Sequence, residues 1–417
     1  MPRRLDRNLR RTRLTISTLQ PSRVLVIGGS IGGLTAACLL RDAGHDVEIH
    51  ERAPRELEQR GAGIGFLRAC SRYLAERAGV DLDEISITTS EIVYLDRDDT
   101  VLHQADHAYR FSSWNTVYRR LLGAFDGDRY HLDRTAVEVR NDERGASVAF
   151  DDGSALSADL VVAADGIGST VRAQLLPDAR ADYSGYVAWR GTVSEADLPP
   201  EITARLGDAI TYHVYANSHI LVYPIPSLDG SVEPGERLLN FVWYRNYLDG
   251  GDLRSLLTDH DGVVRDISVP PGLVAPEHVA ELRATAAARL PATIAAIVAA
   301  VEEPFLQVVY DISISRMRFG RVCLIGDAAF AVRPHAAAGT AKAAEDAWTL
   351  DRHLRSGGDI DSALQRWETE QLALGRDLLD RTRRIGARSQ VLNTWKPGDP
   401  ELIFGLHEPG DPEPANV

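Results

Sequence analysis

Two segments far apart in the sequence constrain this chain more than any other feature. Near the start, an apolar run ends in a glycine-rich turn, Gly28-Gly29-Ser30-Ile31-Gly32-Gly33, and a second apolar run ends at Glu51. Much later, the apolar run of residues 322–325 ends in Gly326-Asp327. Glycines between a strand and a helix let a pyrophosphate approach backbone N–H groups, and an acidic residue after the next strand accepts hydrogen bonds from a ribose. The first segment therefore predicts a dinucleotide site, and the second predicts a further contact from a distant part of the chain.

Two more motifs accompany these segments. An apolar run over 160–164 leads into Asp165-Gly166, and an Ala-rich helical pattern begins at Gly339-Thr340-Ala341. A carboxylate that follows a buried strand, such as Asp327, can hold the ribityl hydroxyls of a flavin, and the positive end of a helix can stabilise negative charge on its ring. The set predicts FAD. Taken singly, the motifs also fit an ordinary strand–helix turn, a common Asp-Gly turn and a helix-capping aspartate.

Composition excludes several classes of protein. A net charge of −14 argues against a nucleic-acid partner, and no apolar stretch is long enough for a membrane helix. The first 20 residues are basic and lack the apolar core of a signal peptide, so we expect a cytoplasmic protein. Cys38, Cys70 and Cys323 have no metal-binding spacing. They predict buried free thiols, and we expect no metal site.

The pattern along the chain predicts an α/β protein with a discontinuous Rossmann-like FAD-binding domain, an inserted, mostly antiparallel β-sheet substrate domain and C-terminal helices. The sequence pattern changes at about residue 180, where aromatic-rich, strand-like segments replace the alternation of strands and helices. The predicted order is a basic extension (1–21), FAD domain (22–90), substrate-domain strands (91–110), FAD domain (111–178), substrate domain (179–310), FAD domain (311–358), a helical segment (359–395) and an irregular tail (396–417).

In this order and spacing, the motifs resemble those of the single-component FAD-dependent aromatic hydroxylases, the para-hydroxybenzoate hydroxylase-like group, over residues 22–390. Further segments resemble the 2,6-dihydroxypyridine 3-hydroxylase branch of that family: Ser112-Ser113-Trp114, Tyr186-Val187-Ala188-Trp189-Arg190-Gly191, Tyr223-Pro224-Ile225-Pro226, Asn240-Phe241-Val242-Trp243-Tyr244, and residues 339–347.

The resemblance implies an enzyme that hydroxylates a small hydroxylated aromatic or N-heteroaromatic ring with FAD, NADH or NADPH, and O2, through a flavin C4a-hydroperoxide. It also implies a homodimer and a nicotinamide site without a second Rossmann unit. The expected cofactor-binding residues are Gly28, Ser30, Ile31, Gly33, Glu51, Arg52, Arg119, Asp165, Gly166, Asp327, Pro334, Gly339, Thr340 and Ala341.

The group that activates the substrate hydroxyl is expected on the aromatic-rich sheet or beside the flavin. The candidates are His213, Tyr215, Tyr223 and His335, because a neutral histidine accepts a proton near neutral pH and a tyrosine relays one. His213, Tyr215 and Tyr223 share sequence parity and are expected on one face. His219 is a further candidate for this role on the sheet. Arg190 is a candidate for binding an anionic substrate, and Asp311 for lining the pocket. Each of these side chains also fits a packing or structural role.

Departures from the family pattern leave the substrate open. Trp114 stands where an arginine is common, and Ala336 and Ala341 replace the usual glycine and asparagine. The alternatives are a tailoring hydroxylase of a larger natural-product aromatic, a flavin halogenase or reductase, and a non-catalytic flavin-binding regulator. The usual Trp-x-Trp-x-Ile-Pro halogenase signature is absent, although Lys342 lies on the helix expected beside the flavin.

Overall fold

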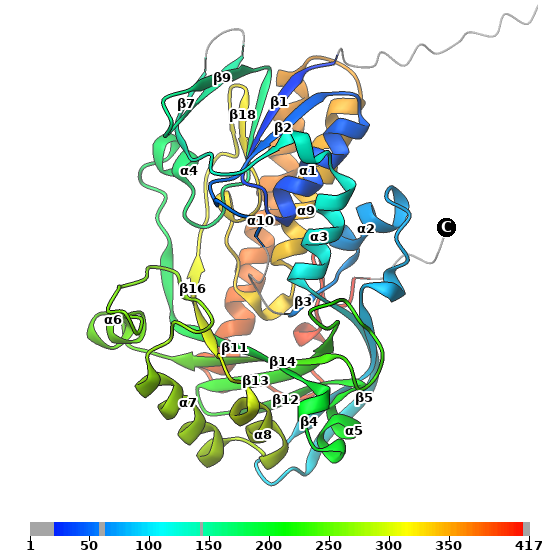
Figure 1. Cartoon of the computed structure of the whole chain (residues 1–417), viewed down its shortest axis with the longest axis vertical. Helices are drawn as coiled ribbons and strands as arrows, with labels where there is room; N and C mark the ends of the chain where they lie inside the picture. Colours follow the sequence, from blue (N-terminus) through cyan, green and yellow to red (C-terminus); the bar gives the residue numbers. More distant parts are fainter. Residues whose placement is uncertain (1–20, 58–62, 142–144, 412–417) are drawn as a thin grey trace, which may run out of the picture.

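The computed structural model describes residues 21–57, 63–141 and 145–411, so nearly all of the basic extension lies outside the described residues. Figure 1 shows two parts: one built on a six-stranded sheet, the other on a nine-stranded sheet. None of the described helices is long and apolar enough to cross a membrane. The domain boundaries given above stay a prediction.

The six-stranded sheet is parallel except for the edge strand β17, which is antiparallel to β18. In spatial order it contains β17 (Arg318–Phe319), β18 (Val322–Leu324), β10 (Leu160–Ala163), β1 (Arg23–Ile27), β2 (Asp46–His50) and β6 (Tyr130–His131). Val24 to Ile27 of β1 are all buried, because helices or strands cover both faces of the sheet.

The parallel arrangement brings the distant motifs together. β1 pairs with β10, and β10 pairs with β18, so Ile27, Ala163 and Leu324 lie side by side. The backbone hydrogen bonding continues one residue beyond the strands. There the N–H of Ala164 donates to the carbonyl of Ile27, and the N–H of Ile325 donates to the carbonyl of Ala163. Because parallel strands end at the same edge, the turns that follow them meet there.

The nine-stranded sheet is antiparallel except where β12 pairs with β4. Its spatial order is β15 (Ser268–Val269), β16 (Phe305–Asp311), β11 (Asp182–Ser194), β14 (Leu238–Asn246), β13 (Ser218–Ile225), β12 (Ala209–Tyr215), β4 (Ile87–Leu95), β5 (Val101–Ser113) and β3 (Gly63–Gly65). The predicted mixed α/β architecture with a mostly antiparallel second sheet is confirmed.

A third sheet packs beside the first. It consists of β7 (Ala136–Asn141), β8 (Ala146–Phe150) and β9 (Ala155–Ala158). Phe150 is buried in the same core as β1 and β2. Cys38, Cys70 and Cys323 are buried free thiols, as expected.

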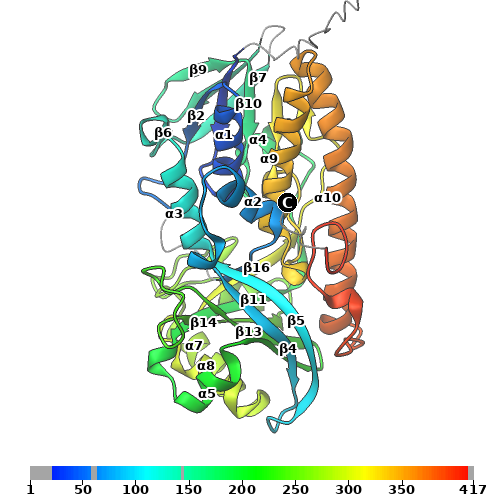
Figure 2. The same ribbon diagram turned by 90° about the vertical axis from the view of Figure 1, so that its right-hand side faces the viewer.

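The helices cover the sheets and connect the two parts. They are α1 (Ile31–Asp42), α2 (Arg68–Glu76), α3 (Trp114–Ala124), α4 (Thr170–Leu175), α5 (Pro200–Leu206), α6 (Gly251–Leu256), α7 (Pro276–Arg289), α8 (Ala292–Ala300), α9 (Gly339–Arg355) and α10 (Ile360–Gln390). α7 and α8 are separate helices, because Pro291 between them cannot continue the hydrogen-bond ladder. Figure 2 shows α10 running along both parts.

The glycine turn tolerates no side chain at Gly33, the third residue of α1. A Cβ added at Gly33 would lie 2.0 Å from the carbonyl oxygen of Gly28, a backbone atom that cannot swing away. We expect Gly33→Ala to lower the free energy of unfolding by about 1–3 kcal/mol, the usual cost of overpacking. Urea unfolding would measure the change.

Gly123→Ala is the matched control. Gly123 lies in α3, and its added Cβ would meet no atom within 4 Å. Alanine should leave stability unchanged or raise it by about 0.5–1 kcal/mol. Equal unfolding midpoints for the two variants would contradict the packing argument.

Candidate active site

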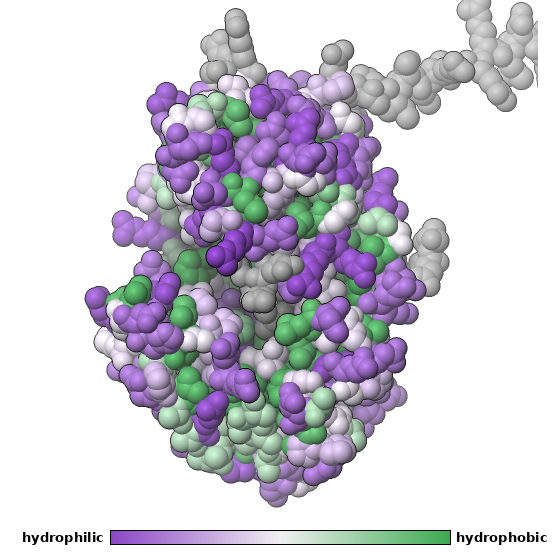
Figure 3. All heavy atoms as spheres, in the orientation of Figure 1, coloured by the Kyte–Doolittle hydropathy of each residue, from purple (hydrophilic) through white to green (hydrophobic). Residues whose placement is uncertain are grey.

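Two adjoining cavities lie where the strand ends of the six-stranded sheet face the nine-stranded sheet. Each has a volume of about 360 Å³, and Ser30, Trp114, Gly166 and Gln307 belong to the walls of both. The space-filling view shows the surface hollowed between the two parts of the molecule (Figure 3). We call the cavity beside Glu51 the outer cavity and the one beside Asp327 the inner cavity.

The outer cavity is lined by the first group of predicted cofactor residues: Gly28, Ser30, Glu51, Arg52, Asp165 and Gly166. Ser30 precedes α1 without capping it, so its hydroxyl stays available at the positive end of the helix. The carboxylate of Glu51 accepts hydrogen bonds from the N–H groups of Gly29 (2.8 Å) and Ala53 (2.9 Å). Glu51 thus fixes the glycine turn while facing the cavity.

Asp165 and Arg172 stabilise the Asp165-Gly166 turn by hydrogen bonds. Asp165 accepts from the hydroxyl of Ser169 (2.6 Å) and the N–H of Val171 (3.2 Å), and burial raises the pKa of its carboxyl. The guanidinium of Arg172 donates to the carbonyls of Ile167, Asp327 (3.2 Å) and Ala328 (3.1 Å). Arg172 therefore ties the Asp-Gly turn to the Gly-Asp turn. No role was predicted for Arg172 from the sequence, although it follows a predicted strand and turn.

The inner cavity is lined by the second group of predicted residues: Ser30, Ile31, Gly166, Asp327, Pro334, Gly339 and Thr340. Asp327 faces the cavity, and its partial removal from solvent by the surrounding protein raises the pKa of its carboxyl. Lys342 and Arg172 act in the opposite direction and favour the ionised form.

A buried ion pair supports the Asp327 turn. Lys342 and Asp346 are one helical turn apart on α9, both 0% exposed, with Nζ and Oδ2 2.7 Å apart. The same oxygen of Asp346 accepts from the N–H of Gly326 at 2.8 Å. The helix thereby holds the backbone next to Asp327.

Three predicted cofactor residues do not line either cavity. Gly33 lies inside α1, where it permits close packing, and Ala341 is buried inside α9. Arg119 is exposed on α3, and its guanidinium donates to the carbonyl of Leu228 at 3.2 Å. The geometry therefore gives no support to a phosphate contact from Arg119.

Aromatic side chains and one cation close the far end of the inner cavity. Phe111 and Tyr223 stack with ring centroids 4.2 Å apart, and the hydroxyl of Tyr223 donates to the carbonyl of Gly63 at 2.9 Å. Tyr244 and Arg190 also line this end. Burial raises the pKa of Tyr223 to about 12, although Arg190 acts in the opposite direction.

The prediction that His213, Tyr215 and Tyr223 share a face is wrong. Tyr215 pairs with Ser218 across the β12–β13 hairpin, so an odd-numbered residue faces an even-numbered one and the parity changes at the turn. Tyr223 faces the cavity, whereas His213 and Tyr215 lie on the opposite face. There His213 is buried with Nδ1 2.9 Å from the carbonyl of Leu95.

His335 lies behind the cavity wall, not in it. Its Nε2 is 2.7 Å from the hydroxyl of Tyr186, and its ring is 4.6 Å from that of Tyr244. His219 belongs to the same cluster, because its ring centroid lies 5.3 Å from that of His335. Gly386 of α10 leaves room for His335, since a Cβ at Gly386 would lie 2.8 Å from Nε2 of His335.

Asp311 is another structural residue. Its carboxylate pairs with Arg333 (2.8 Å) and Arg383 (2.9 Å), and it does not belong to either cavity wall. The guanidinium of Arg333 lies 5.6 Å from the ring centroid of Tyr186. The ion pairs therefore anchor the outer end of the Tyr186–His335 cluster.

The cavities fit FAD on structural grounds. The outer cavity offers the uncapped N-terminus of α1, the Ser30 hydroxyl and Glu51, which suit a pyrophosphate and a ribose. The inner cavity offers Asp327 for a ribityl chain and the N-terminus of α9, which has no side-chain cap, for a flavin ring.

Comparisons with known proteins agree with this geometry. Family profiles match residues 273–382 (FAD binding domain), 183–311 (FAD binding domain-like) and 26–56 (NAD(P)-binding Rossmann-like domain). Among curated relatives, the chain is 27% identical to a FAD-dependent urate hydroxylase of Klebsiella pneumoniae, over 89% of this chain and 93% of that protein. A Klebsiella pneumoniae HpxO variant, solved with FAD, has 25% identity and a TM-score of 0.73 and covers 89% of this chain and 91% of its own.

The chain belongs to the FAD-dependent aromatic hydroxylase family, and it is a flavoprotein monooxygenase that uses NAD(P)H and O2. Within this family it is similar to 2,6-dihydroxypyridine 3-monooxygenase of Paenarthrobacter nicotinovorans. The two are 37% identical over 391 residues, which is 94% of this chain and 97% of that protein. The solved 2,6-dihydroxypyridine-3-hydroxylase of Arthrobacter nicotinovorans superposes with a TM-score of 0.89, at 36% identity, over 95% of this chain and 100% of its own.

Asp327→Ala is expected to lower FAD occupancy, because it removes the carboxylate that faces the inner cavity. The flavin-to-protein absorbance ratio of the purified variant would measure the loss. Asp377→Ala is the control, since Asp377 is exposed on α10 and lines neither cavity. Full flavin retention in Asp327→Ala would contradict the assigned role.

Stability is expected to fall as the pH falls below about 6.5, the pKa of an exposed histidine. Burial lowers the pKa of His219 to about 3 and that of His335 well below its ordinary value. The unfolded chain therefore takes up protons that the folded chain does not bind, which costs about 1.4 kcal/mol per pH unit for each group.

His219→Phe removes one of these groups. Urea unfolding of the FAD-saturated protein between about pH 7 and pH 5 should show a shallower loss of stability in the variant. An unchanged slope would mean that His219 is not held neutral in the fold.

Proposed function

We propose that this monooxygenase hydroxylates a small N-heteroaromatic ring of the dihydroxypyridine type, bound as an anion against Arg190. The observation that carries the proposal is the position of Arg190. It is the one cationic side chain in the wall of the inner cavity, among the residues that the structure describes. Aromatic and aliphatic side chains make up most of the surrounding wall.

The nine-stranded sheet positions Arg190, which lies on β11. On adjacent strands Arg190 pairs with Val242, and Val242 pairs with Leu221, so all three face the cavity. The Nε atom of Arg190 is buried and has no hydrogen-bond partner within the described chain. An ionised ring hydroxyl in the cavity would attract the guanidinium of Arg190, and the low polarity of the aromatic wall strengthens this attraction.

Bound FAD, reduced by NAD(P)H, supplies the activation of O2 that inserts one oxygen atom into the ring. The residues of this chain orient the reactants and exclude water. We propose that Ser30, Glu51 and Asp327 hold the cofactor and that Arg190 favours the ionised substrate hydroxyl, since an opposite charge lowers its pKa. An ionised hydroxyl enriches the ring in electrons at the positions next to and opposite it.

The predicted roles of the histidines change accordingly. His213 and Tyr215 lie on the far face of the sheet, so we no longer propose them as catalytic residues. We propose His335 as a positioning residue, because it contacts Tyr186 and the ring of Tyr244 from behind the wall. Tyr223 lines the cavity, but its hydroxyl donates to Gly63, so we propose that it shapes the wall.

The relatives support a heteroaromatic substrate. Both 2,6-dihydroxypyridine 3-monooxygenase and the urate hydroxylase carry names of N-heteroaromatic substrates. A halogenase is disfavoured because Lys342 is fully buried, paired with Asp346 and absent from both cavity walls. A homodimer, the cytoplasmic location and a preference for NADH remain predictions.

The test is NADH consumption with 2,6-dihydroxypyridine, together with the mass of the product. We expect strong stimulation and a product heavier by one oxygen atom. 2,6-Dimethoxypyridine is the control ligand, because it has the same ring and no hydroxyl to ionise. No stimulation by the dihydroxy compound would reject this substrate and favour a larger aromatic. Stimulation without oxygenated product would show an effector only.

Arg190→Gln tests the anion site. We expect the substrate KM to rise about tenfold or more, because hydrogen bonds to charged groups contribute about 1.5–3 kcal/mol. FAD content should stay unchanged. Arg376→Gln, at an exposed position on α10, should leave both quantities unchanged. An unaltered KM in Arg190→Gln would contradict the proposal.

A further inference from the structure

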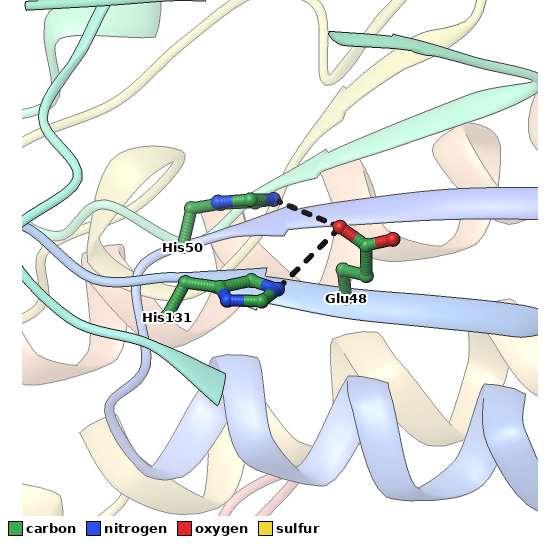
Figure 4. A group of neighbouring side chains, drawn as sticks. All are labelled: Glu48, His50 and His131. Carbon is green, nitrogen blue, oxygen red and sulfur yellow. Dashed lines mark ion pairs between the residues drawn. The ribbon is translucent and has the colours of Figure 1, made fainter. Parts of the chain in front are cut away.

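A second cluster of chemically active side chains lies at the edge of the six-stranded sheet. Glu48 and His50 are two residues apart on β2, so they share a face, and His131 of β6 pairs directly with His50. Figure 4 shows both imidazole rings pointing at the same carboxylate oxygen of Glu48. Sequence spacing could not reveal this cluster, because β6 pairs with β2 only in the fold.

The distances suit a metal ion. Nε2 of His50 lies 3.6 Å and Nε2 of His131 lies 3.5 Å from Oε2 of Glu48, and the three ligand atoms lie within 4.8 Å of one another. Nitrogen and oxygen ligands lie about 2.0–2.2 Å from Zn²⁺, so neighbours around a tetrahedral ion are roughly 3.3–3.6 Å apart. Two of the three spacings therefore already match.

His50 gives an independent indication of a ligand. Its side chain is 2% exposed, and neither ring nitrogen has a hydrogen-bond partner in the described chain. The ring lies between His131 (centroids 4.9 Å apart) and Phe150 (4.7 Å).

The neighbouring charges leave one oxygen of Glu48 open. Arg129 (3.1 Å) and Arg23 (3.4 Å) contact Oε1 of Glu48, so Oε2 remains for the histidines. Such contacts orient a ligating carboxylate. Their positive charge also opposes a cation, although Arg129 is partly neutralised by Asp46 at 2.9 Å. We therefore expect reversible binding and not a permanent structural ion.

We propose that Glu48, His50 and His131 form a binding site for a divalent transition-metal ion, Zn²⁺ being the best match to two imidazoles and a carboxylate. An open pocket of about 500 Å³ borders all three residues and gives solvent access to the remaining coordination position. His50 also lines the outer cavity and directly precedes Glu51. A bound ion would therefore fix the strand end that carries Glu51.

The test is isothermal titration of the tag-free full-length chain with ZnCl₂, and with MgCl₂ as a hard cation. We expect saturable binding of one Zn²⁺ per chain and no comparable binding of Mg²⁺. His131→Ala and Glu48→Gln should each weaken Zn²⁺ binding at least about tenfold, since each removes a ligand. His353→Ala is the matched control: His353 pairs with Glu370 at 2.9 Å, but no third ligand joins the pair among the described residues.

The outcome is decisive in either direction. Tenfold weakening in His131→Ala with unchanged binding in His353→Ala would support the site. No saturable Zn²⁺ binding by the wild type, or unchanged binding in His131→Ala, would overturn it. His131 is part-exposed, so its loss should leave the fold intact, and thermal unfolding without metal would verify this.

Discussion

The parallel pairing of β1, β10 and β18 is the interaction on which the site depends. The three strands are buried in one core, and their shared register places Ile27, Ala163 and Leu324 in a row. The turns that follow them therefore converge at one edge, although they come from the beginning, middle and end of the chain. Arg172 then ties two of these turns together through backbone carbonyls. Because every part of the cofactor cradle rests on this edge, small errors in the pairing would displace all of its groups at once.

The nine-stranded sheet supplies the aromatic and cationic part of the inner cavity wall, which the strand ends of the six-stranded sheet do not provide. It places a cation, Arg190, beside aromatic side chains in the wall of the cavity that Asp327 also lines, where the low polarity of the wall strengthens charge interactions. α10 supports this wall from behind, and Gly386 lets the buried His335 and Tyr186 approach it closely. The nucleotide-binding part and the substrate-binding part thus remain separate in construction but share one cavity.

Much of the fold and of the cofactor site could be predicted from the sequence, because glycine turns and buried strands have strong local signals. Glu51, Asp165 and Asp327 line the cavities as expected. The positions of the substrate-binding side chains were harder to predict. The parity rule failed for His213 and Tyr215 because the register of the β12–β13 hairpin, which the sequence alone did not determine, shifts the faces by one residue. Arg119 looked available for phosphate, but the orientation of α3 exposes it. The Glu48–His50–His131 cluster depends on long-range strand pairing, and no local pattern indicates it.

We propose that one FAD lies across both cavities, with its adenosine end at Glu51 and its ring facing Arg190. A crystal structure of the protein soaked with FAD tests this most directly. We expect continuous density that passes Ser30, reaches Asp327 with the ribityl chain and ends with the flavin ring beside the aromatic wall. A flavin in the opposite direction, or one bound away from the strand ends of β1, β10 and β18, would contradict the account.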